Sequence, residues 1–476
     1  MSEYKQYIGG ELVEGEGDIL SVICPGNAEV AGKVKLASAT QAEQALWAAQ
    51  EAFQTWSKLP LEERGAWMIR LRDAIEEEQE TLLQLLMLET GKLRQDAKDE
   101  IANLINTFSF NLETAKNFFD ETIRDTSGSC FNLVVREPVG VVVGYLAWNF
   151  PLHNLSAKIG PVLASGCTAV FKPSSLTPLS TLYVGEIMHR IGFPKGVINI
   201  ISGATSVVSE VMTKSKIPAM LCLIGSSRAG AEVIRDSATS IKRFSLELGG
   251  NAPFIVTPNA VIDEAVWRCV NSQMYVASQN CTGVQRVFAH VSVYNEFVEK
   301  VVRQARDVHC GWGDAAGCNM GPMITDKVVE RMQALVDDAV EKGAKVLTGG
   351  RKPKKEKGYY YLPTVLVDVT TDMRVFREEV FGPIVSIMKY EEMEEAIRLA
   401  NDTEYGLTAY VWSHNADEIY KYAQALRFGT ISVNGGCDGV HMPHGGIKES
   451  GIGKDGGRWA LEEYYFYKGI RLHMNL

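Results

Sequence analysis

The sequence predicts an α/β fold in which a doubly wound parallel sheet is followed by a second α/β domain. Strand-like apolar runs such as "TAVFKPSS" (168–175) and "GVINIISG" (196–203) alternate with helical segments such as "LSTLYVGEIMHRIG" (179–192). A second alternation runs from "APFIVT" (252–257) to "TISVNG" (430–435). Short buried strands that alternate with helices are typical of parallel sheets covered on both faces. The length of 476 residues also favours two or three domains.

The region 41–120, ahead of these strands, is predicted to be helical. Segments such as "QAEQALWAAQEAFQTW" (41–56) carry apolar residues at three- and four-residue spacing and contain few glycines or prolines. This amphipathic pattern indicates helices that pack against the first sheet.

Two strand-like segments lie outside both alternations. They are "SCFNLVVREP" (129–138) and the C-terminal "EEYYFYKGIRLHMNL" (462–476). Exposed strand edges invite pairing, so these segments predict a small β oligomerisation arm, with an ordinary edge hairpin as the alternative. The predicted division is therefore 1–117 with 139–249 for the first domain, 250–445 for the second, and 118–138 with 446–476 for the arm.

Composition and charge exclude several functional classes. A formal net charge of −10 argues against nucleic acid or an anionic membrane as a partner. The nine cysteines form no C-x-x-C pair, so neither a disulfide framework nor a zinc site is indicated, and no metal site is expected. No signal peptide and no apolar run of about 20 residues is present, so we expect a reducing, cytoplasmic setting.

Two glycine-containing stretches are candidates for binding a phosphate. "GIGKDG" (451–456) matches the spacing G-x-G-x-x-G, but it lies near the C-terminus with no buried strand before it, so we reject it. In "LCLIGSSRAGAEVIRDSA" (221–238), an apolar strand ends at Gly225, and Ser226 can cap the helix that follows. Free N–H groups at a helix start suit a phosphate, although this pattern is common and is weak evidence by itself.

The residues that suggest catalysis are one cysteine and one glutamate. Cys281 lies among small polar residues in "SQNCTGVQRV" (278–287), whereas structural cysteines usually have apolar neighbours. Glu247 lies in the apolar strand of "FSLELGGNAP" (244–253). A carboxylate is costly to bury without a partner or a function, and a general base is one such function.

With these two motifs, "YLAWNFPLHN" (145–154), "FKPSSLTP" (171–178) and "EEVFGPIV" (378–385) complete an ordered set along the chain. This set resembles that of the aldehyde dehydrogenase superfamily over essentially the whole chain. The resemblance implies a Rossmann-like cofactor domain and oxidation of an aldehyde to its carboxylic acid. Cys281 matches the nucleophile, Asn149 the side-chain oxyanion donor, and Glu247 the base that activates water to hydrolyse a thioester.

The resemblance also implies NAD or NADP as the cofactor. Lys172 matches the lysine that holds the adenosine ribose, and Glu379, with Phe381 beside it, matches the residue that holds the nicotinamide ribose. Gly225 and Ser226 match the pyrophosphate-binding turn. Trp148 is expected on the cofactor side of the strand end that precedes it.

Three residues depart from the usual family pattern. Ser175 stands where the family often has a glutamate that would repel a 2′-phosphate, so we expect NADP⁺ to be accepted, with Lys172 and Arg228 as phosphate partners. Asn251 stands where lysine is usual. Ser278 stands where glycine is usual, and glycine tolerates a positive φ at no cost.

The substrate is expected to be a small polar aldehyde. Cys281 is flanked by Asn280 and Thr282, and the loop "NGGCDGVHMPHGG" (434–446) contains an "MPHGG" that resembles the aminoaldehyde and betaine-aldehyde branch. No arginine is clearly aimed at an anionic tail, although Arg286 is near in sequence.

Two other functions stay open on the sequence. One is a CoA-acylating semialdehyde dehydrogenase, against which Glu247 argues, and the other is a non-catalytic binding protein on the same fold. A homodimer or homotetramer is expected.

Overall fold

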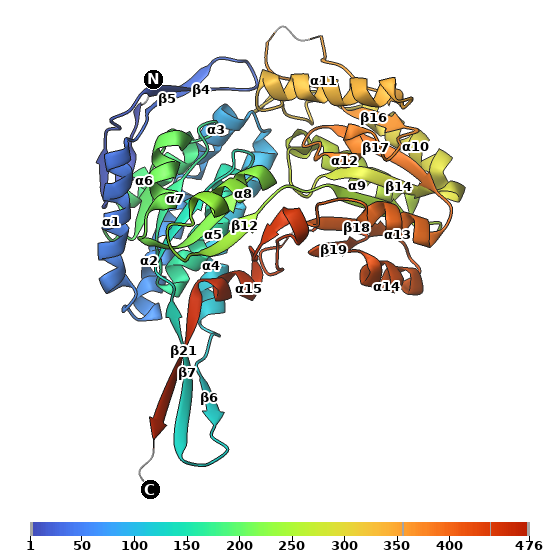
Figure 1. The fold of residues 1–476 in the computed structure, drawn as a ribbon. Helices are drawn as coiled ribbons and strands as arrows, with labels where there is room; N and C mark the ends of the chain where they lie inside the picture. The colour runs from blue at the N-terminus through green and yellow to red at the C-terminus, as the bar shows by residue number, and fades with distance from the viewer. Residues whose placement is uncertain (1–2, 355–356, 438, 474–476) are drawn as a thin grey trace.

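A computed structural model describes residues 3–354, 357–437 and 439–473. The extreme ends of the predicted first domain and of the arm, 1–2 and 474–476, lie outside the described residues, as does Asp438 of the loop 434–446. Figure 1 shows two lobes side by side, with a narrow β arm projecting from the first lobe. A small sheet near the N-terminus joins β1 (Glu3–Tyr4), β5 (Val30–Lys35) and β4 (Ile19–Ile23).

The first lobe is built on an eight-stranded sheet with the order β20-β12-β11-β8-β9-β10-β2-β3. Its central strands are parallel and comprise β8 (Val141–Tyr145), β9 (Thr168–Lys172), β10 (Ile198–Ile200), β11 (Pro218–Ile224) and β12 (Arg243–Glu247). Antiparallel strands at its edges are β2 (Gln6–Ile8), β3 (Glu11–Val13) and β20 (Gly451–Ile452). The chain runs from β8 out to β10 and then crosses to β11 on the other side of β8. This reversal opens a crevice at the carboxyl ends of β8 and β11.

Helices cover both faces of this sheet, as the alternation predicts. Val141 and Val143 of β8 pack with α1 (Ala39–Trp56) and α7 (Glu210–Lys214), whereas Val142 faces the opposite cluster. That cluster contains α2 (Leu61–Glu77), α3 (Gln79–Thr90), α4 (Arg94–Ala115), α5 (Pro151–Ser165) and α6 (Leu179–Arg190). The first of the helices, α1, begins with a reciprocal cap, in which Ser38 Oγ accepts the Gln41 N–H and Gln41 Oε1 accepts the Ser38 N–H.

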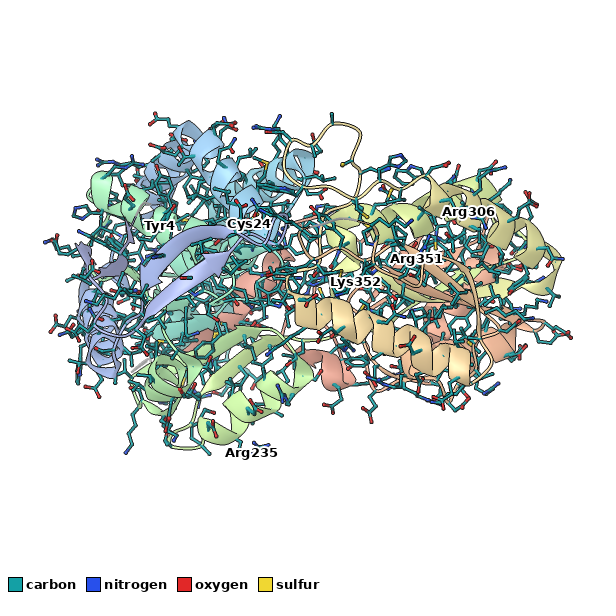
Figure 2. All side chains as sticks on the ribbon, turned by 90° about the horizontal axis from the view of Figure 1, so that it is seen from above. Tyr4, Cys24, Arg235, Arg306, Arg351 and Lys352 are labelled. Atoms are coloured by element: carbon teal, nitrogen blue, oxygen red, sulfur yellow. The ribbon has the colours of Figure 1, made fainter. Side chains whose placement is uncertain are left out.

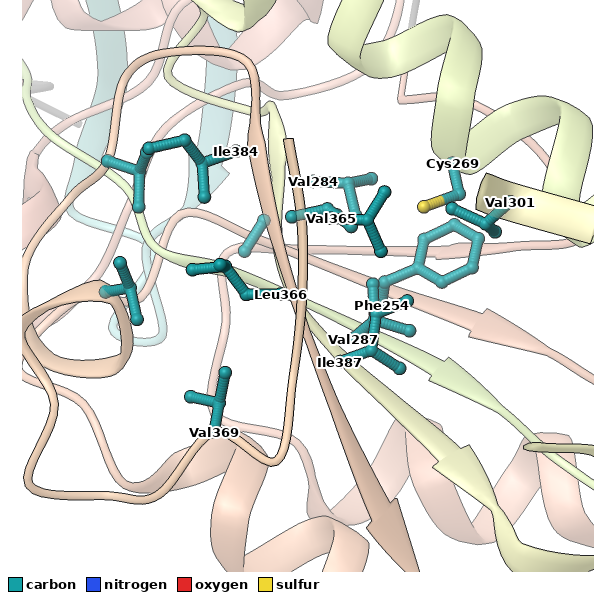
Figure 3. Close-up of a cluster of buried hydrophobic side chains, with 14 of the residues drawn as sticks. Phe254, Cys269, Val284, Val287, Val301, Val365, Leu366, Val369, Ile384 and Ile387 are labelled. Atoms are coloured by element: carbon teal, nitrogen blue, oxygen red, sulfur yellow. The ribbon is translucent and has the colours of Figure 1, made fainter. Parts of the chain in front are cut away.

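The second lobe has a seven-stranded sheet with the order β15-β16-β17-β14-β13-β18-β19. The parallel strands are β13 (Ala252–Val256), β14 (Val284–His290), β16 (Thr364–Val367), β17 (Ile384–Tyr390), β18 (Thr408–Trp412) and β19 (Thr430–Val433), and β15 (Lys345–Thr348) is antiparallel. Its helices are α9 (Ile262–Met274), α10 (Val291–Arg306), α11 (Asp326–Glu341), α12 (Arg374–Arg377), α13 (Met393–Asn401) and α14 (Ala416–Ala425). Figure 3 shows Phe254 of β13 and Val287 of β14 packed near Cys269 of α9 and Val301 of α10.

The arm is a three-stranded antiparallel sheet of β6 (Glu121–Arg124), β7 (Cys130–Pro138) and β21 (Tyr465–His473). The sequence assigns 446–476 to the arm, but within the described part of that range, 446–473, only β21 lies in this sheet. The strand β20 pairs with β12, and α15 (Gly457–Glu463) contacts α4 and α5. The rejected "GIGKDG" therefore contains an edge strand and a turn rather than the start of a βαβ unit.

The helices that cover the two sheets form the outer surface of each lobe. In Figure 2, seen from above, Arg235 on α8 (Ser227–Asp236) marks the surface of the first lobe, and Arg306 on α10 marks that of the second. Within the described ranges, no helix combines the length and the apolar character needed to cross a membrane.

Candidate active site

The predicted site residues of the first lobe lie at the carboxyl ends of its parallel strands. Each of them ends or directly follows one of β8, β9, β11 or β12, and they are Trp148, Asn149, Lys172, Gly225, Ser226 and Glu247. This edge holds the crevice made by the reversal of strand order, which is where open α/β sheets bind their ligands. The topology therefore brings together residues that are up to a hundred positions apart in sequence.

A cavity of about 200 Å³ joins this edge to the second lobe. Asn149 and Glu247 line it from the first lobe, and Cys281 lines it from the loop between α9 and β14. The three predicted catalytic residues thus share one cavity wall. Its size suits a small substrate.

The turn that carries Cys281 is strained and firmly held. Val276, Ala277 and Ser278 all have positive φ, at 51°, 51° and 55°, a region that side chains other than glycine rarely adopt. The side chain of Gln279 fastens the turn, since its Nε2 donates to the carbonyls of Val276 and Pro322 (3.0 and 3.1 Å). Strain of this kind persists only where the surroundings fix it, and it is common at active sites.

Asn149 contacts the same turn. Its Nδ2 donates to the backbone carbonyl of Gln279 (3.0 Å), and its Oδ1 accepts from Asn154 Nδ2 (3.4 Å). An amide nitrogen carries two N–H groups, so the second can serve a developing oxyanion in the cavity.

Cys281, Glu247 and His444 form a compact group at this wall. His444 Nε2 lies 3.2 Å from Glu247 Oε1, and the ligand atoms of the three side chains lie within 4.8 Å of one another. Burial raises the pKa of the Cys281 thiol, and the charge and hydrogen bond of Glu247 raise it further. The resting group is therefore a thiol beside a carboxylate that can accept its proton.

The predicted cofactor residues lie at strand ends and in turns of both lobes. Trp148 and Phe381 meet edge to face with ring centroids 5.5 Å apart. Glu379 is half-buried, its Oε1 accepts the N–H of Gly250 (2.8 Å), and desolvation raises its pKa to about 7. Burial lowers the pKa of Lys172 to about 8. Ser226 Oγ accepts the Ala229 N–H (3.2 Å) and caps α8, while Ser175 is exposed beyond β9.

Comparison with known proteins identifies the family. The sequence model of the Aldehyde dehydrogenase family matches residues 12–470. The chain belongs to the aldehyde dehydrogenase family. It is thus an oxidoreductase that acts on aldehydes with NAD or NADP.

This aldehyde dehydrogenase is similar to characterised relatives over nearly its full length. It is 36% identical over 460 residues to a glutarate-semialdehyde dehydrogenase of Pseudomonas putida, covering 96% of this chain and 95% of the relative. It is 35% identical over 459 residues to an NADP⁺ succinate-semialdehyde dehydrogenase of Escherichia coli, with 96% and 95% covered. Among solved structures, betaine aldehyde dehydrogenase of Staphylococcus aureus with NAD⁺ superposes with a TM-score of 0.96 at 35% identity, covering 99% of this chain and 95% of the other.

The residues at the strand ends fit a dinucleotide. At Gly249 an added Cβ would lie 2.8 Å from Glu379 Oε2, so glycine keeps the space beside that carboxylate open. The Lys172 ammonium has no hydrogen-bond partner among the described residues and is desolvated, as expected for a group that awaits a polar ligand. When bound, the cofactor supplies a hydride acceptor at this crevice.

The structure explains two residues about which the sequence left doubt. Arg286 is fully buried and donates to the backbone carbonyls of Asn251 and Ala400 (both 2.9 Å from Nη2), so it does not reach the cavity. Asn251 is itself buried, and its Nδ2 donates to the Phe376 carbonyl (2.9 Å). Both residues brace the second lobe rather than touch a substrate.

Two charged pairs at the cavity wall were missed by sequence reasoning. Glu100 pairs with Lys92 and accepts the N–H groups of Leu152 and His153 (2.7 and 3.1 Å) at the start of α5. Asp455 pairs with Lys158 of α5 (2.5 Å). In the sequence, the only indication of these pairs is that the otherwise apolar segment of α5 contains polar residues such as His153 and Lys158.

Proposed function

We propose that this aldehyde dehydrogenase oxidises a small polar aldehyde without a carboxylate tail to its carboxylic acid, through a thioester on Cys281. The observation that carries the proposal is the arrangement of Cys281, Glu247 and Asn149 around one small cavity. Among the described residues that line this cavity, none is lysine or arginine.

The chemistry begins at the thiol. Glu247 accepts the Cys281 proton, and the thiolate adds to the aldehyde carbon to give a thiohemiacetal. The Asn149 amide and the backbone N–H of Cys281 donate to the oxyanion, and each such donor is worth about 10²–10³ in rate. Loss of hydride from the same carbon leaves a thioester. Glu247 first releases to solvent the proton that it took from Cys281. It then takes a proton from water as the water oxygen attacks the thioester carbon, and it returns this proton to the Cys281 sulfur as the C–S bond breaks and the acid leaves.

Charge in the cavity favours a neutral or cationic substrate. Its carboxylates are Glu100, Asp455 and Glu247, and the lysines that neutralise the first two, Lys92 and Lys158, lie behind the wall and are buried. An anionic tail would therefore meet no free cation, and burying it unpaired would be costly. Amide and hydroxyl groups of Asn103, Asn280 and similar residues can bind hydroxyl or amino groups.

The two semialdehyde relatives make this a sharp test, because their named substrates carry a carboxylate. We expect hydroxy- or aminoaldehydes to give a kcat/KM at least about tenfold above that of succinate or glutarate semialdehyde, as the cost of an unpaired charge implies. The measurement is reduction of NAD⁺ or NADP⁺ at 340 nm with a panel of both substrate classes. Preference for a semialdehyde would overturn the substrate assignment but leave the thioester route intact.

The CoA-acylating alternative is distinguished by its product. With coenzyme A present, we expect free acid and no acyl-CoA, since Glu247 is placed to activate water. Acyl-CoA as the main product would contradict the hydrolytic assignment.

We also propose a homo-oligomer joined through the arm, and a cytoplasmic location. The exposed apolar residues of the arm, such as Ile123 and Phe131, support the first proposal. No disulfide joins the cysteines of the described residues, which supports the second proposal, because thiols persist in reducing compartments.

A further inference from the structure

His444 has a backbone position that is tightly fixed. Its N–H donates to the Asp455 carbonyl, and the Asp455 N–H donates back to the His444 carbonyl (both 2.5 Å). Gly445 follows with φ of +151°, where an added Cβ would lie 2.7 Å from the carbonyl oxygen of Gly453. The "HGG" of this loop is therefore built to present the imidazole at one place.

The imidazole lies against the carboxylate of Glu247, the proposed base. His444 Nε2 lies 3.2 Å from Glu247 Oε1, and the side chains are 31% and 7% exposed. His444 also lines the cavity that holds Cys281. Glu247 is the last residue of β12. Among the described residues, only the side chains of His444 and Cys281 form hydrogen bonds with its carboxylate.

The charged groups that face His444 come from three elements. Glu247 comes from the end of β12, Asp455 from the loop after β20, and Lys158 and His153 from α5, while the Cys281 thiol faces it across the cavity. Burial by itself would lower the pKa of His444, but the hydrogen bond and charge of Glu247, helped by Asp455, raise it overall. The imidazolium form is thus present to a higher pH than in an isolated histidine.

We propose that His444 is a positioning residue that holds the Glu247 carboxylate toward the thioester and controls, through its own protonation, when that carboxylate can accept a proton from water. This inference rests on the proposed role of Glu247. A carboxylate that accepts a hydrogen bond from a cation is a poorer proton acceptor. Thioester hydrolysis should therefore speed up as the pH rises through the His444 titration and the imidazolium is lost.

Thioester hydrolysis can be isolated from the oxidation step. 4-Nitrophenyl acetate acylates Cys281 without any cofactor, because the thiolate displaces 4-nitrophenolate and leaves an acetyl thioester that water then hydrolyses. The burst of 4-nitrophenolate reports acylation, and the steady rate that follows reports hydrolysis, each measured as a function of pH. The variants are His444→Phe, His444→Gln and Glu247→Gln.

We expect His444→Phe to slow hydrolysis about tenfold or more, since a small misplacement of a catalytic group can cost up to about 10², while the burst remains. His444→Gln keeps a donor but cannot titrate, so it should restore most of the rate and lose the acid limb of the pH profile that the His444 titration produces. The matched control is His441→Phe, the same change three residues earlier at an exposed side chain that does not line the cavity. It should behave as the wild type.

The outcomes separate the two proposals. If Glu247→Gln hydrolyses the thioester at the wild-type rate, the proposed role of Glu247 fails. If Glu247→Gln is slow but His444→Phe keeps the wild-type rate and acid limb, only the role of His444 is overturned. Should His444→Phe not fold, His444→Gln decides, because an unchanged acid limb in that variant would also overturn the proposal.

Discussion

At the scale of single residues, the Cys281 thiol is held in its protonated form by its surroundings. Burial and the neighbouring Glu247 both raise its pKa. A thiolate is the reactive species, so in the proposed mechanism reactivity toward the aldehyde depends on transfer of the Cys281 proton to Glu247.

This protonation state predicts slow alkylation. Iodoacetamide should modify Cys281 slowly at pH 7 and faster as the pH rises toward the raised pKa, because the thiolate fraction grows. Glu247→Gln removes the negative charge, lowers the thiol pKa and should speed alkylation at pH 7, because the thiolate fraction grows. Mass spectrometry measures the rate, and Cys281→Ser confirms the modified site. Slower alkylation in Glu247→Gln would contradict this account.

Ser278 carries a second residue-scale prediction. It has φ of 55°, and its buried Oγ has no hydrogen-bond partner among the described residues. Ser278→Gly removes the backbone strain of the positive φ and the buried hydroxyl, and it should raise the free energy of unfolding by about 1 kcal/mol. Urea denaturation measures the change. Ser215→Gly, at φ of −61°, is the matched control and should lower stability instead.

Ser175 predicts the choice of cofactor. We expect NADP⁺ to be used with a kcat/KM within a hundredfold of that for NAD⁺, because no carboxylate opposes the 2′-phosphate. Ser175→Glu introduces that repulsion and should lower the ratio of NADP⁺ to NAD⁺ efficiency by at least about tenfold. Ser174→Glu, one residue earlier, serves as the control. An unchanged ratio in Ser175→Glu would place the 2′-phosphate elsewhere.

At the scale of elements, α4 anchors the start of α5 through one buried ion pair. The side chains of Lys92 and Glu100 are both fully buried, and Glu100 also accepts two N–H groups at the start of α5. Because Asn149 lies two residues before that helix start, this pair also holds the proposed oxyanion donor in place.

Breaking the pair should cost stability. Glu100→Gln leaves Lys92 buried and unpaired, and we expect the free energy of unfolding to fall by about 3–5 kcal/mol. Thermal or urea denaturation gives the value. Glu113→Gln breaks the exposed pair with Lys116 on the same helix and should change stability by less than about 1 kcal/mol. A loss below about 1 kcal/mol in Glu100→Gln would show that the pair is not structural.

At the scale of the whole molecule, the arm extends β7 and β21 away from both lobes (Figure 1). Ile123 and Phe131 on the arm are 51% and 44% exposed, an apolar surface that contact with another subunit would cover.

We expect sedimentation velocity to show a dimer or tetramer at micromolar concentration. The double variant Ile123→Asp with Phe131→Asp should dissociate it, whereas Val340→Asp, at a similarly exposed position on α11, should not. A monomeric wild type would contradict the proposed arm.

The sequence by itself determined the fold class, the family and the separate motifs around Cys281, Glu247 and Lys172. These follow from apolar periodicity and from short ordered motifs, which are local properties of the chain. The division of the chain into two domains and an arm, with boundaries at 117, 138, 249 and 445, remains a prediction. In the structure, β20 pairs with β12 of the first lobe, and this antiparallel pairing between residues about 200 positions apart leaves no local signal.

Only the tertiary structure decided which side chains meet. The "MPHGG" motif suggested a branch of the family, but not that His444 would contact Glu247, 197 positions away. Likewise Arg286 lies near Cys281 in sequence, yet β14 directs it into the second lobe. Contacts of this kind depend on how two sheets are placed against each other, and that placement is set by the packing of whole layers rather than by any short stretch of sequence.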